Sequence, residues 1–226
     1  MARTTLALTS FVSGEFGNKL TGRTDFDKYN SAAKTMENFL VHPQGAATRR
    51  VGTQFIASVK TAANKTRLIP FEFSTTQTYI LEFGDQYIRF YKDKGQIVSG
   101  GSAYEISTPY LTAELFDIKF AQSADVMYLV HPNHDVRKLS RTGHTSWTLA
   151  TVSFSGSPSL PIAGANNRPS SVSFYEQRLA FAGTNNNPQT IWFSKAGDYE
   201  NFTTGTNADD AMIYTIASNQ VNAIRY

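Results

Sequence analysis

Two histidines separated by two residues form the pattern best able to support chemistry in this sequence. His131 and His134 stand in the segment His131-Pro132-Asn133-His134-Asp135, and His144 follows nearby. An HxxH pair binds a metal when its ring nitrogens converge. Here the pair lies in a proline-containing turn, which does not hold the spacing of the two rings as a helix does. We therefore expect an exposed turn and no metal site.

The other polar motifs are incomplete for the chemistry they could serve. Asp209-Asp210 lacks the spaced oxygen ligands and the glycine of a calcium loop. Ser155 lies in no GxSxG motif, and no glycine-rich phosphate loop follows a predicted strand. The paired carboxylates of a glycosidase are related in space, so the sequence neither shows nor excludes them. We expect a protein that is not an enzyme, with no catalytic residue and no cofactor.

The composition excludes several classes of protein. The chain has 226 residues and no cysteine, which excludes disulfide frameworks, zinc–thiolate sites and cysteine nucleophiles. Only 17% of the residues are charged and the net charge is +3, which is not the composition of a nucleic-acid-binding domain. No run approaches the roughly 18 apolar residues of a membrane helix, and the N-terminus lacks the apolar core of a secretion signal, so we expect no stable membrane insertion.

The N-terminal region is predicted to consist of an extended arm followed by a helix. Residues 1–23 are predicted to form an extended arm with Phe11 and Phe16 as apolar anchors. Residues 25–40 carry apolar side chains at the 3-and-4 spacing of one helical face, and Pro43 follows them. This spacing predicts one amphipathic α-helix that packs on a core.

Beyond residue 51 the apolar period changes to two, and 13% of the whole chain is aromatic, which together predict β-strands. The expected strands are FIASV (55–59), RLIPFEF (67–73), YILEF (79–83), YIRFY (87–91), QIV (96–98), VMYLV (126–130), VRKLSR (136–141), SWTLATVSF (146–154), VSFYEQRLAFAG (172–183) and TIWFSKAG (190–197). A three-residue loop, Gly84-Asp85-Gln86, is expected between the third and fourth of them.

Three return strands end in a similar way, with an apolar residue, a small or aromatic residue and a basic residue. The three are Phe90-Tyr91-Lys92, Leu139-Ser140-Arg141 and Phe193-Ser194-Lys195, and they recur about every 50 residues, close to the period of β-propeller blades. An ordinary antiparallel meander repeats in the same manner, so both interpretations stay open. The fold class expected is mainly β, with antiparallel, propeller-blade-like hairpins, an N-terminal arm and one α-helix.

Four segments are predicted along the chain. They are an N-terminal arm and helix at 1–50, a first β-domain at 51–154, a linker or long loop at 155–171, and the start of a further β-module at 172–226. The last segment ends among residues that look like strands, so we expect it to be truncated.

Long strings in this sequence resemble a family of tailed-bacteriophage virion proteins. The strings are GRTDFDKY (22–29), ENFLVHPQG (37–45), TRRVGTQFIA (48–57), IPFEFS (69–74), YILEFGDQYIRFYKD (79–93), FAQSADVMYLVHP (120–132), RKLSRTGHTSWTL (137–149) and PQTIWFSKAGDYENF (188–202). The family includes phage stabilisation proteins and the tail nozzle proteins, also called tail tubular protein B, of short-tailed phages.

The resemblance implies a structural component of the phage tail, located in the virion and made in the cytoplasm of the bacterial host. The expected partners are other copies of the chain in a nozzle-like ring, with a hexamer as one candidate size, and adjacent tail or adaptor proteins. Phage double-stranded DNA would cross the ring only in transit. The residues expected at assembly interfaces are Phe11, Phe16, Arg49 and Arg50. The alternative is a tail protein that binds a receptor or a glycan through aromatic and asparagine-rich loops such as TNNNPQ (184–189).

Overall fold

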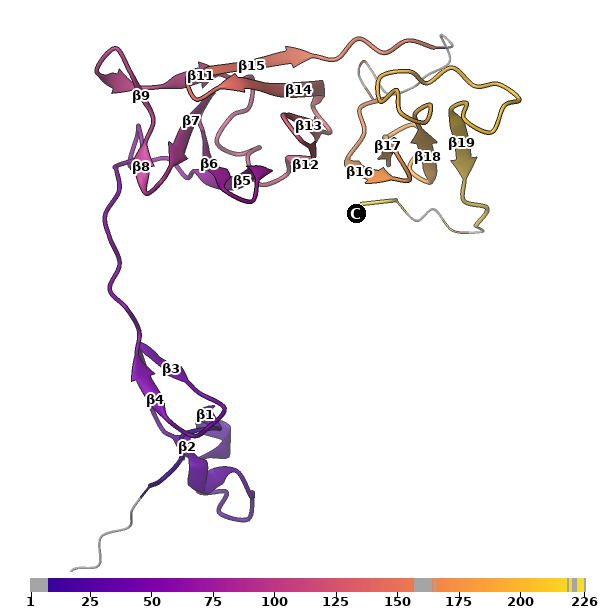
Figure 1. Ribbon diagram of the computed structural model, residues 1–226. Coiled ribbons are helices and arrows are strands. Elements are labelled where there is room, and N and C mark those ends of the chain that lie inside the picture. The colour runs from indigo at the N-terminus through magenta and orange to yellow at the C-terminus, as the bar shows by residue number, and fades with distance from the viewer. Residues whose placement is uncertain (1–7, 157–163, 165, 219, 221–222, 226) are drawn as a thin grey trace, which may run out of the picture. The chain divides into compact units, whose positions relative to one another are not determined.

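The computed structural model describes residues 8–156, 164, 166–218, 220 and 223–225 (Figure 1). The chain forms two compact units, Met1–Phe55 and Ile56–Tyr226. Strands hold 44% of the described residues, mostly in antiparallel sheets, which confirms the mainly β class predicted from the sequence. Within the described residues these sheets close into neither a barrel nor a propeller. The finer predicted boundaries at residues 50, 154 and 171 stay predictions, and 157–163 and 165 of the predicted linker lie outside the described residues.

The first unit consists of short elements joined by turns. They are β1 (Gly14–Glu15), η1 (Asn18–Leu20), η2 (Tyr29–Ser31), β2 (Ala32–Ala33), β3 (Phe39–Val41) and β4 (Ala47–Arg49). Strand β1 pairs with β2 in parallel, and β3 pairs with β4 as an antiparallel hairpin. The turn of that hairpin contains Gly45, which has a φ of 103° and is buried against Ser10.

The α-helix predicted over 25–40 is wrong. Only the 3-10 turn η2 is helical there, and the chain then enters β2 and β3. An amphipathic helix of this length depends on packing its apolar face against a core. The described residues of this unit, 8–55, offer no such core, because Phe26 and Phe39 are 43% and 50% exposed. Asn38, with a φ of 63°, also takes the left-handed conformation that a helix interior excludes.

The second unit contains three main sheets. The first has the order β11-β7-β6-β5, with β8 paired to the end of β7, and the other two follow chain order as β12-β13-β14-β15 and β16-β17-β18-β19. Their strands are β5 (Arg67–Ser74), β6 (Gln77–Gly84), β7 (Tyr87–Lys92), β8 (Gly95–Gln96), β11 (Glu105–Ser107), β12 (Lys119–Ser123), β13 (Val126–His131), β14 (His134–Gly143), β15 (Ser146–Thr151), β16 (Ser171–Tyr175), β17 (Arg178–Ala182), β18 (Thr190–Phe193) and β19 (Met212–Thr215). A separate small hairpin joins β9 (Val98–Ser99) to β10 (Ser102–Ala103).

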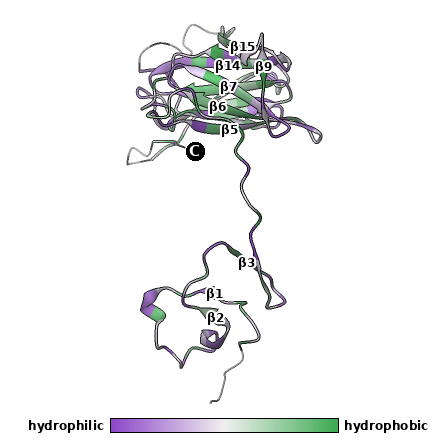
Figure 2. Cartoon of the chain, turned by 90° about the vertical axis from the view of Figure 1, so that its left-hand side faces the viewer, coloured by the Kyte–Doolittle hydropathy of each residue, from purple (hydrophilic) through white to green (hydrophobic). Residues whose placement is uncertain are grey.

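Strand β13, inside the middle sheet, is buried on both faces, which explains its unbroken apolar run. Met127 and Leu129 belong to a core shared with the first sheet, whereas Tyr128 and Val130 belong to a core shared with the third. Successive side chains of a strand point to opposite faces, so a strand between two cores must be apolar at every position. The three sheets therefore pack in series, and Figure 2 shows apolar residues concentrated along the strands of this unit.

The turn between β6 and β7 is one residue shorter than predicted. Gly84 pairs with Tyr87, which leaves only Asp85 and Gln86 in the loop. A Cβ at Gly84 would lie 2.1 Å from the Tyr87 ring. The glycine is thus a strand residue that makes room for an aromatic ring, rather than a turn residue.

The strand predicted at 55–59 is also wrong, since no regular element is present between Arg50 and Val59. A strand persists only where it finds a partner edge. The outer edge of β5 is closed, because the Gln122 side chain bonds the Glu72 N–H at 3.1 Å and the Glu72 carbonyl at 2.9 Å. Pro70, in the middle of β5, has no N–H to offer. The apolar segment before β5 is therefore left extended and unpaired.

Candidate functional site

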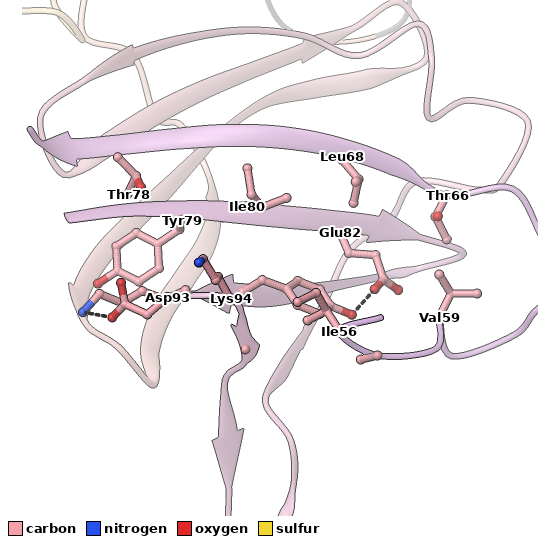
Figure 3. Close-up of a pocket in the computed structure, with 14 residues that line it drawn as sticks. Ile56, Val59, Thr66, Leu68, Thr78, Tyr79, Ile80, Glu82, Asp93 and Lys94 are labelled. Atoms are coloured by element: carbon pink, nitrogen blue, oxygen red, sulfur yellow. Dashed lines mark hydrogen bonds and ion pairs between the residues drawn. The ribbon is translucent and has the colours of Figure 1, made fainter. Parts of the chain in front are cut away.

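A groove of about 580 Å³ lies on the outer face of β5 and β6 (Figure 3). Leu68 on β5 and Ile80 on β6 form its apolar floor and are 63% and 41% exposed. The segment preceding β5 and the turn after β7 form its walls. The lining residues are Ile56, Ala57, Val59, Thr66, Leu68, Thr78, Tyr79, Ile80, Glu82, Tyr91, Lys92, Asp93, Lys94 and Gly95.

A buried carboxylate lies at one end of this groove. Glu82 is only 2% exposed and accepts hydrogen bonds from the Tyr87 hydroxyl at 2.6 Å and from the Tyr91 hydroxyl. Burial, followed by the hydrogen bond to Glu82, raises the pKa of Tyr87 to about 12 and raises the pKa of Tyr91 as well. Both phenols therefore remain protonated donors at neutral pH.

The two tyrosines solvate the carboxylate of Glu82 without neutralising it. Its cross-strand neighbour on β7 is Arg89, whose guanidinium instead pairs with Glu105 at 3.0 Å. None of the ion pairs formed among the described residues involves Glu82. The groove thus combines an apolar floor with an anion that lacks a paired cation, which suits a partner with an apolar side chain next to a basic one.

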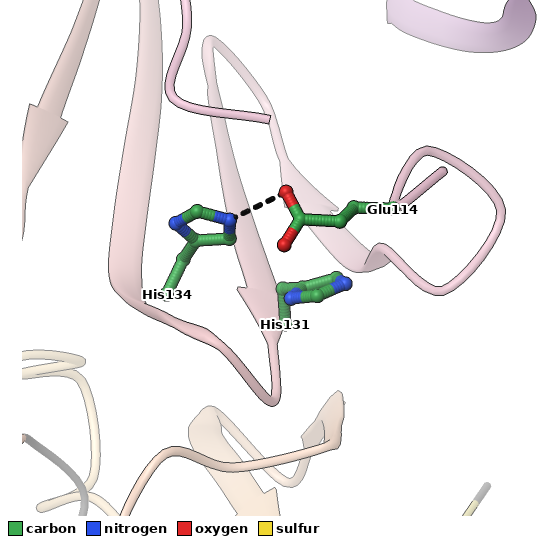
Figure 4. Close-up of side chains that lie close together, drawn as sticks. All are labelled: Glu114, His131 and His134. Atoms are coloured by element: carbon green, nitrogen blue, oxygen red, sulfur yellow. Dashed lines mark hydrogen bonds and ion pairs between the residues drawn. The ribbon is translucent and has the colours of Figure 1, made fainter. Parts of the chain in front are cut away.

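The histidine pair of the predicted turn does converge, together with an acidic residue that the sequence did not indicate. Ligand atoms of Glu114, His131 and His134 lie within 4.8 Å of one another (Figure 4). The other two members of the sequence cluster lie elsewhere: Asp135 pairs with Arg168 at 3.0 Å, and the His144 Nδ1 is 2.7 Å from the Tyr79 hydroxyl. Glu114 comes from a loop between β11 and β12, and no spacing in the sequence connects it to the histidines.

The Glu114 carboxylate joins that loop to the β13–β14 hairpin. It accepts hydrogen bonds from the Leu111 N–H at 3.0 Å and the Asn133 side-chain amide at 3.2 Å, and it lies 2.8 Å from the His134 Nε2. Burial by itself raises the pKa of Glu114, but these hydrogen bonds outweigh it and lower that pKa to about 2. We call Glu114, Asn133 and His134 the loop latch.

The latch leaves little capacity for a metal. The His131 Nδ1 already accepts a hydrogen bond from the Asn133 N–H at 3.0 Å, and burial lowers the pKa of His131. His131 Nε2 is buried and has no hydrogen-bond partner among the described residues. Even so, a Zn²⁺ ion bound here would have to replace the bond of His131 to Asn133 and the bonds that Glu114 accepts. The geometry therefore favours a structural contact over a metal centre.

The predicted assembly residues all lie in the first unit. Phe11 is half-buried, and its N–H donates to the Gly45 carbonyl at 2.8 Å. Phe16 packs on Phe26 with ring centroids 5.8 Å apart. Both residues therefore make contacts within their own unit.

The two arginines differ from each other. Arg50 donates to the Asn38 side chain at 2.6 Å, while the Arg49 side chain is exposed at the end of β4. Arg49 is thus the member of the predicted set most available to a partner.

The acidic pair Asp209-Asp210 forms ion pairs with a lysine of the same chain. The Lys195 ammonium lies 3.2 Å from Asp209 and 3.7 Å from Asp210. This contact lowers the pKa of Asp209 and raises that of Lys195. The pair anchors a loop of the third sheet.

No protein-family model matches the chain, and no curated protein matches it. In the part of the chain that the structure describes, no helix has the length and apolarity needed to cross a bilayer.

Proposed function

We propose that this chain is a structural subunit of a bacteriophage tail that assembles with copies of itself into a nozzle-like ring. DNA crosses this ring during ejection, and adjacent tail or adaptor proteins hold it in the virion. The observation that carries the proposal is the exposure of large apolar side chains in the last residues of the first unit. Val51 and Phe55 are 85% and 78% exposed there.

Such exposure supports assembly because apolar side chains that stay in water do not stabilise a monomer. Burying a side chain such as valine or phenylalanine stabilises a protein or complex by about 1.5–3 kcal/mol. Contiguous exposed apolar surface therefore marks interaction sites in soluble proteins. The groove described above adds Leu68 and Ile80 to the apolar surface that a neighbouring subunit can cover.

The serial packing of the sheets supports a rigid wall. The second and third sheets are four-stranded antiparallel meanders in chain order, and each shares a core with the sheet next to it. We propose that these sheets are blade-like units of a propeller-type domain. The low charge also suits a channel, because each lysine or arginine that contacts a phosphate would retain passing DNA.

The glycan-binding alternative has less support. Trp147 and Trp192, the two tryptophans of the chain, are 5% and 1% exposed, so both fill cores instead of offering a stacking surface to a sugar. Binding of the purified chain on a glycan array would favour this alternative.

The oligomeric state tests the proposal. Native mass spectrometry of the purified chain, combined with negative-stain electron microscopy, is expected to show a closed ring of one stoichiometry. A ring closes only when each subunit contacts the next through two different surfaces, so the particles should show rotational symmetry. A monomer at every concentration, including in the presence of its tail partners, would contradict the proposal.

A further inference from the structure

The extended segment before the second unit presents one apolar face. It has no regular structure from Arg50 onward, and successive side chains of an extended segment point to opposite sides. Arg49, Val51 and Phe55 therefore share a side. That side is basic at Arg49 and apolar at Val51 and Phe55, with the small polar Thr53 between them.

The groove on β5 and β6 has the complementary pattern over the same length. Thr78, Ile80 and Glu82 alternate along the outer face of β6, with Glu82 at one end. Four residue intervals separate Thr78 from Glu82 and Val51 from Phe55, which is about 13 Å of extended chain in both cases. With Val51 at the Glu82 end, the long side chain of Arg49 reaches the buried carboxylate and Phe55 lies near Thr78.

The positions of the charged residues decide whether the segment that binds in the groove comes from the same chain or from a second copy. Phe55 is followed directly by Ile56, which lines the groove at its Glu82 end (Figure 3). A segment folding back onto its own groove would therefore keep Phe55 at that end. It would carry Arg49 toward the turn that contains Lys94, away from Glu82. A second copy has no such tether and can place Arg49 beside Glu82.

We propose that residues 49–55 of one copy bind in the β5–β6 groove of a neighbouring copy, running antiparallel to β6. Arg49 pairs with Glu82, and Val51 and Phe55 cover the apolar floor. This inference rests on the proposed self-assembly and assigns the surfaces through which it occurs.

The absence of cysteine allows a direct test by disulfide trapping. A Phe55→Cys variant and a Thr78→Cys variant, carrying different tags, are mixed in equal amounts and oxidised. A disulfide requires Cα atoms within about 7 Å. We expect a heterodimer joined by this bridge. Phe116, 59% exposed and outside the groove, provides the matched control, so Phe55→Cys mixed with Phe116→Cys should give at least about tenfold less heterodimer.

A double variant tests the arrangement within one chain. Leu68 pairs with Glu82 across the sheet, so it marks the Glu82 end of the groove. A Phe55→Cys, Leu68→Cys chain that closes an intramolecular bridge at a concentration where the Phe55–Thr78 pair gives none would overturn the inference in favour of the tethered arrangement.

The remaining outcomes separate this inference from the proposed ring. A ring that assembles without the Phe55–Thr78 bridge overturns the docking and leaves the ring intact. A bridged dimer that never closes into a ring supports the docking and contradicts the ring. A monomer without any bridge contradicts both.

Charge removal tests the polar contact. Arg49→Gln in the Phe55→Cys chain should lower the yield of the bridged heterodimer by about tenfold, because a charge-assisted contact to a buried carboxylate is lost. Arg50→Gln, which removes the neighbouring charge from the opposite side of the segment, is expected to leave the yield unchanged. Equal yields from the two variants would refute the pairing of Arg49 with Glu82.

Discussion

The loop latch predicts a pH-dependent contribution to stability that a single substitution removes. Replacing Glu114 with alanine deletes the acceptor for the Leu111 N–H and for two side chains of the β13–β14 hairpin. The Glu114 side chain is 16% exposed and its partner His134 is 20% exposed, so solvent replaces these bonds poorly. Hydrogen bonds to a charged group contribute about 1.5–3 kcal/mol, and we expect Glu114→Ala to lower the free energy of unfolding by about 2–3 kcal/mol at pH 7.

The sign of the pH effect follows from the direction of the shift. The pKa of Glu114 is about 2 in the folded chain, below the 4.5 that is ordinary for a glutamate side chain. A carboxyl whose folded pKa is depressed contributes stability above its unfolded pKa, and that stability is lost as the pH falls toward the folded pKa. The difference between the natural chain and Glu114→Ala should therefore be full at pH 6–7 and shrink between about pH 4.5 and 2.

Urea unfolding measured by tryptophan fluorescence provides the assay, because both tryptophans are buried in cores. Asp93→Asn is the matched control: this carboxylate is 77% exposed and pairs with Lys92 on the surface, and asparagine tolerates the left-handed backbone at this position (φ 50°), so the change should cost less than about 0.5 kcal/mol. A Glu114→Ala difference below about 0.5 kcal/mol at pH 7, or one that persists unchanged down to pH 2.5, would refute the account of the latch.

Three further predictions concern the cores, the groove and metals. Leu129→Ala should lower the free energy of unfolding by about 2–5 kcal/mol in urea titrations, because Leu129 is fully buried, whereas Leu68→Ala on the exposed groove floor should change it by less than about 0.5 kcal/mol. Tyr91→Phe removes one of two hydrogen-bond donors to the buried Glu82 and should lower the free energy of unfolding by about 1–3 kcal/mol. Tyr214→Phe, on an exposed ring, should lower it by almost nothing, and equal effects of the two variants in thermal melts would contradict the role of Tyr91. Adding EDTA or ZnCl₂ should shift the Tm by less than about 2 °C, since the latch residues already bond one another, and a larger rise with zinc would point to a metal site instead.

Local sequence patterns predicted the hairpins of the second unit well. Alternating apolar residues placed β5, β6, β7 and β13 to within about two residues, because each of these strands has at least one face on a core. The burial of β13 on both faces was not predicted and became evident only in the structure. Turn lengths were less predictable, as Gly84 shows, because they depend on which residues pair across the strands.

The same reasoning failed where the pattern had no partner to pack against. The apolar spacing of 25–40 and the apolar run of 55–59 are real features of the sequence, yet neither forms the predicted element. The spacing of apolar residues shows which face a helix or strand would bury if it formed. Whether it forms depends on tertiary packing, which must supply a surface for that face to pack against. In both segments some large apolar side chains remain exposed, among them Phe26, Phe39, Phe55 and Ile56, and the proposed assembly would cover such surface.

By itself, the sequence determined the β class and most hairpins, because those depend on contacts between neighbouring strands. It also determined which chemistries lack the residues they need. Only the tertiary structure decided the rest. It brought Glu114 to His134 and placed Glu82 between two tyrosines at the end of an apolar groove. Such contacts join residues whose separation along the chain carries no period, so they exist only once the sheets have packed.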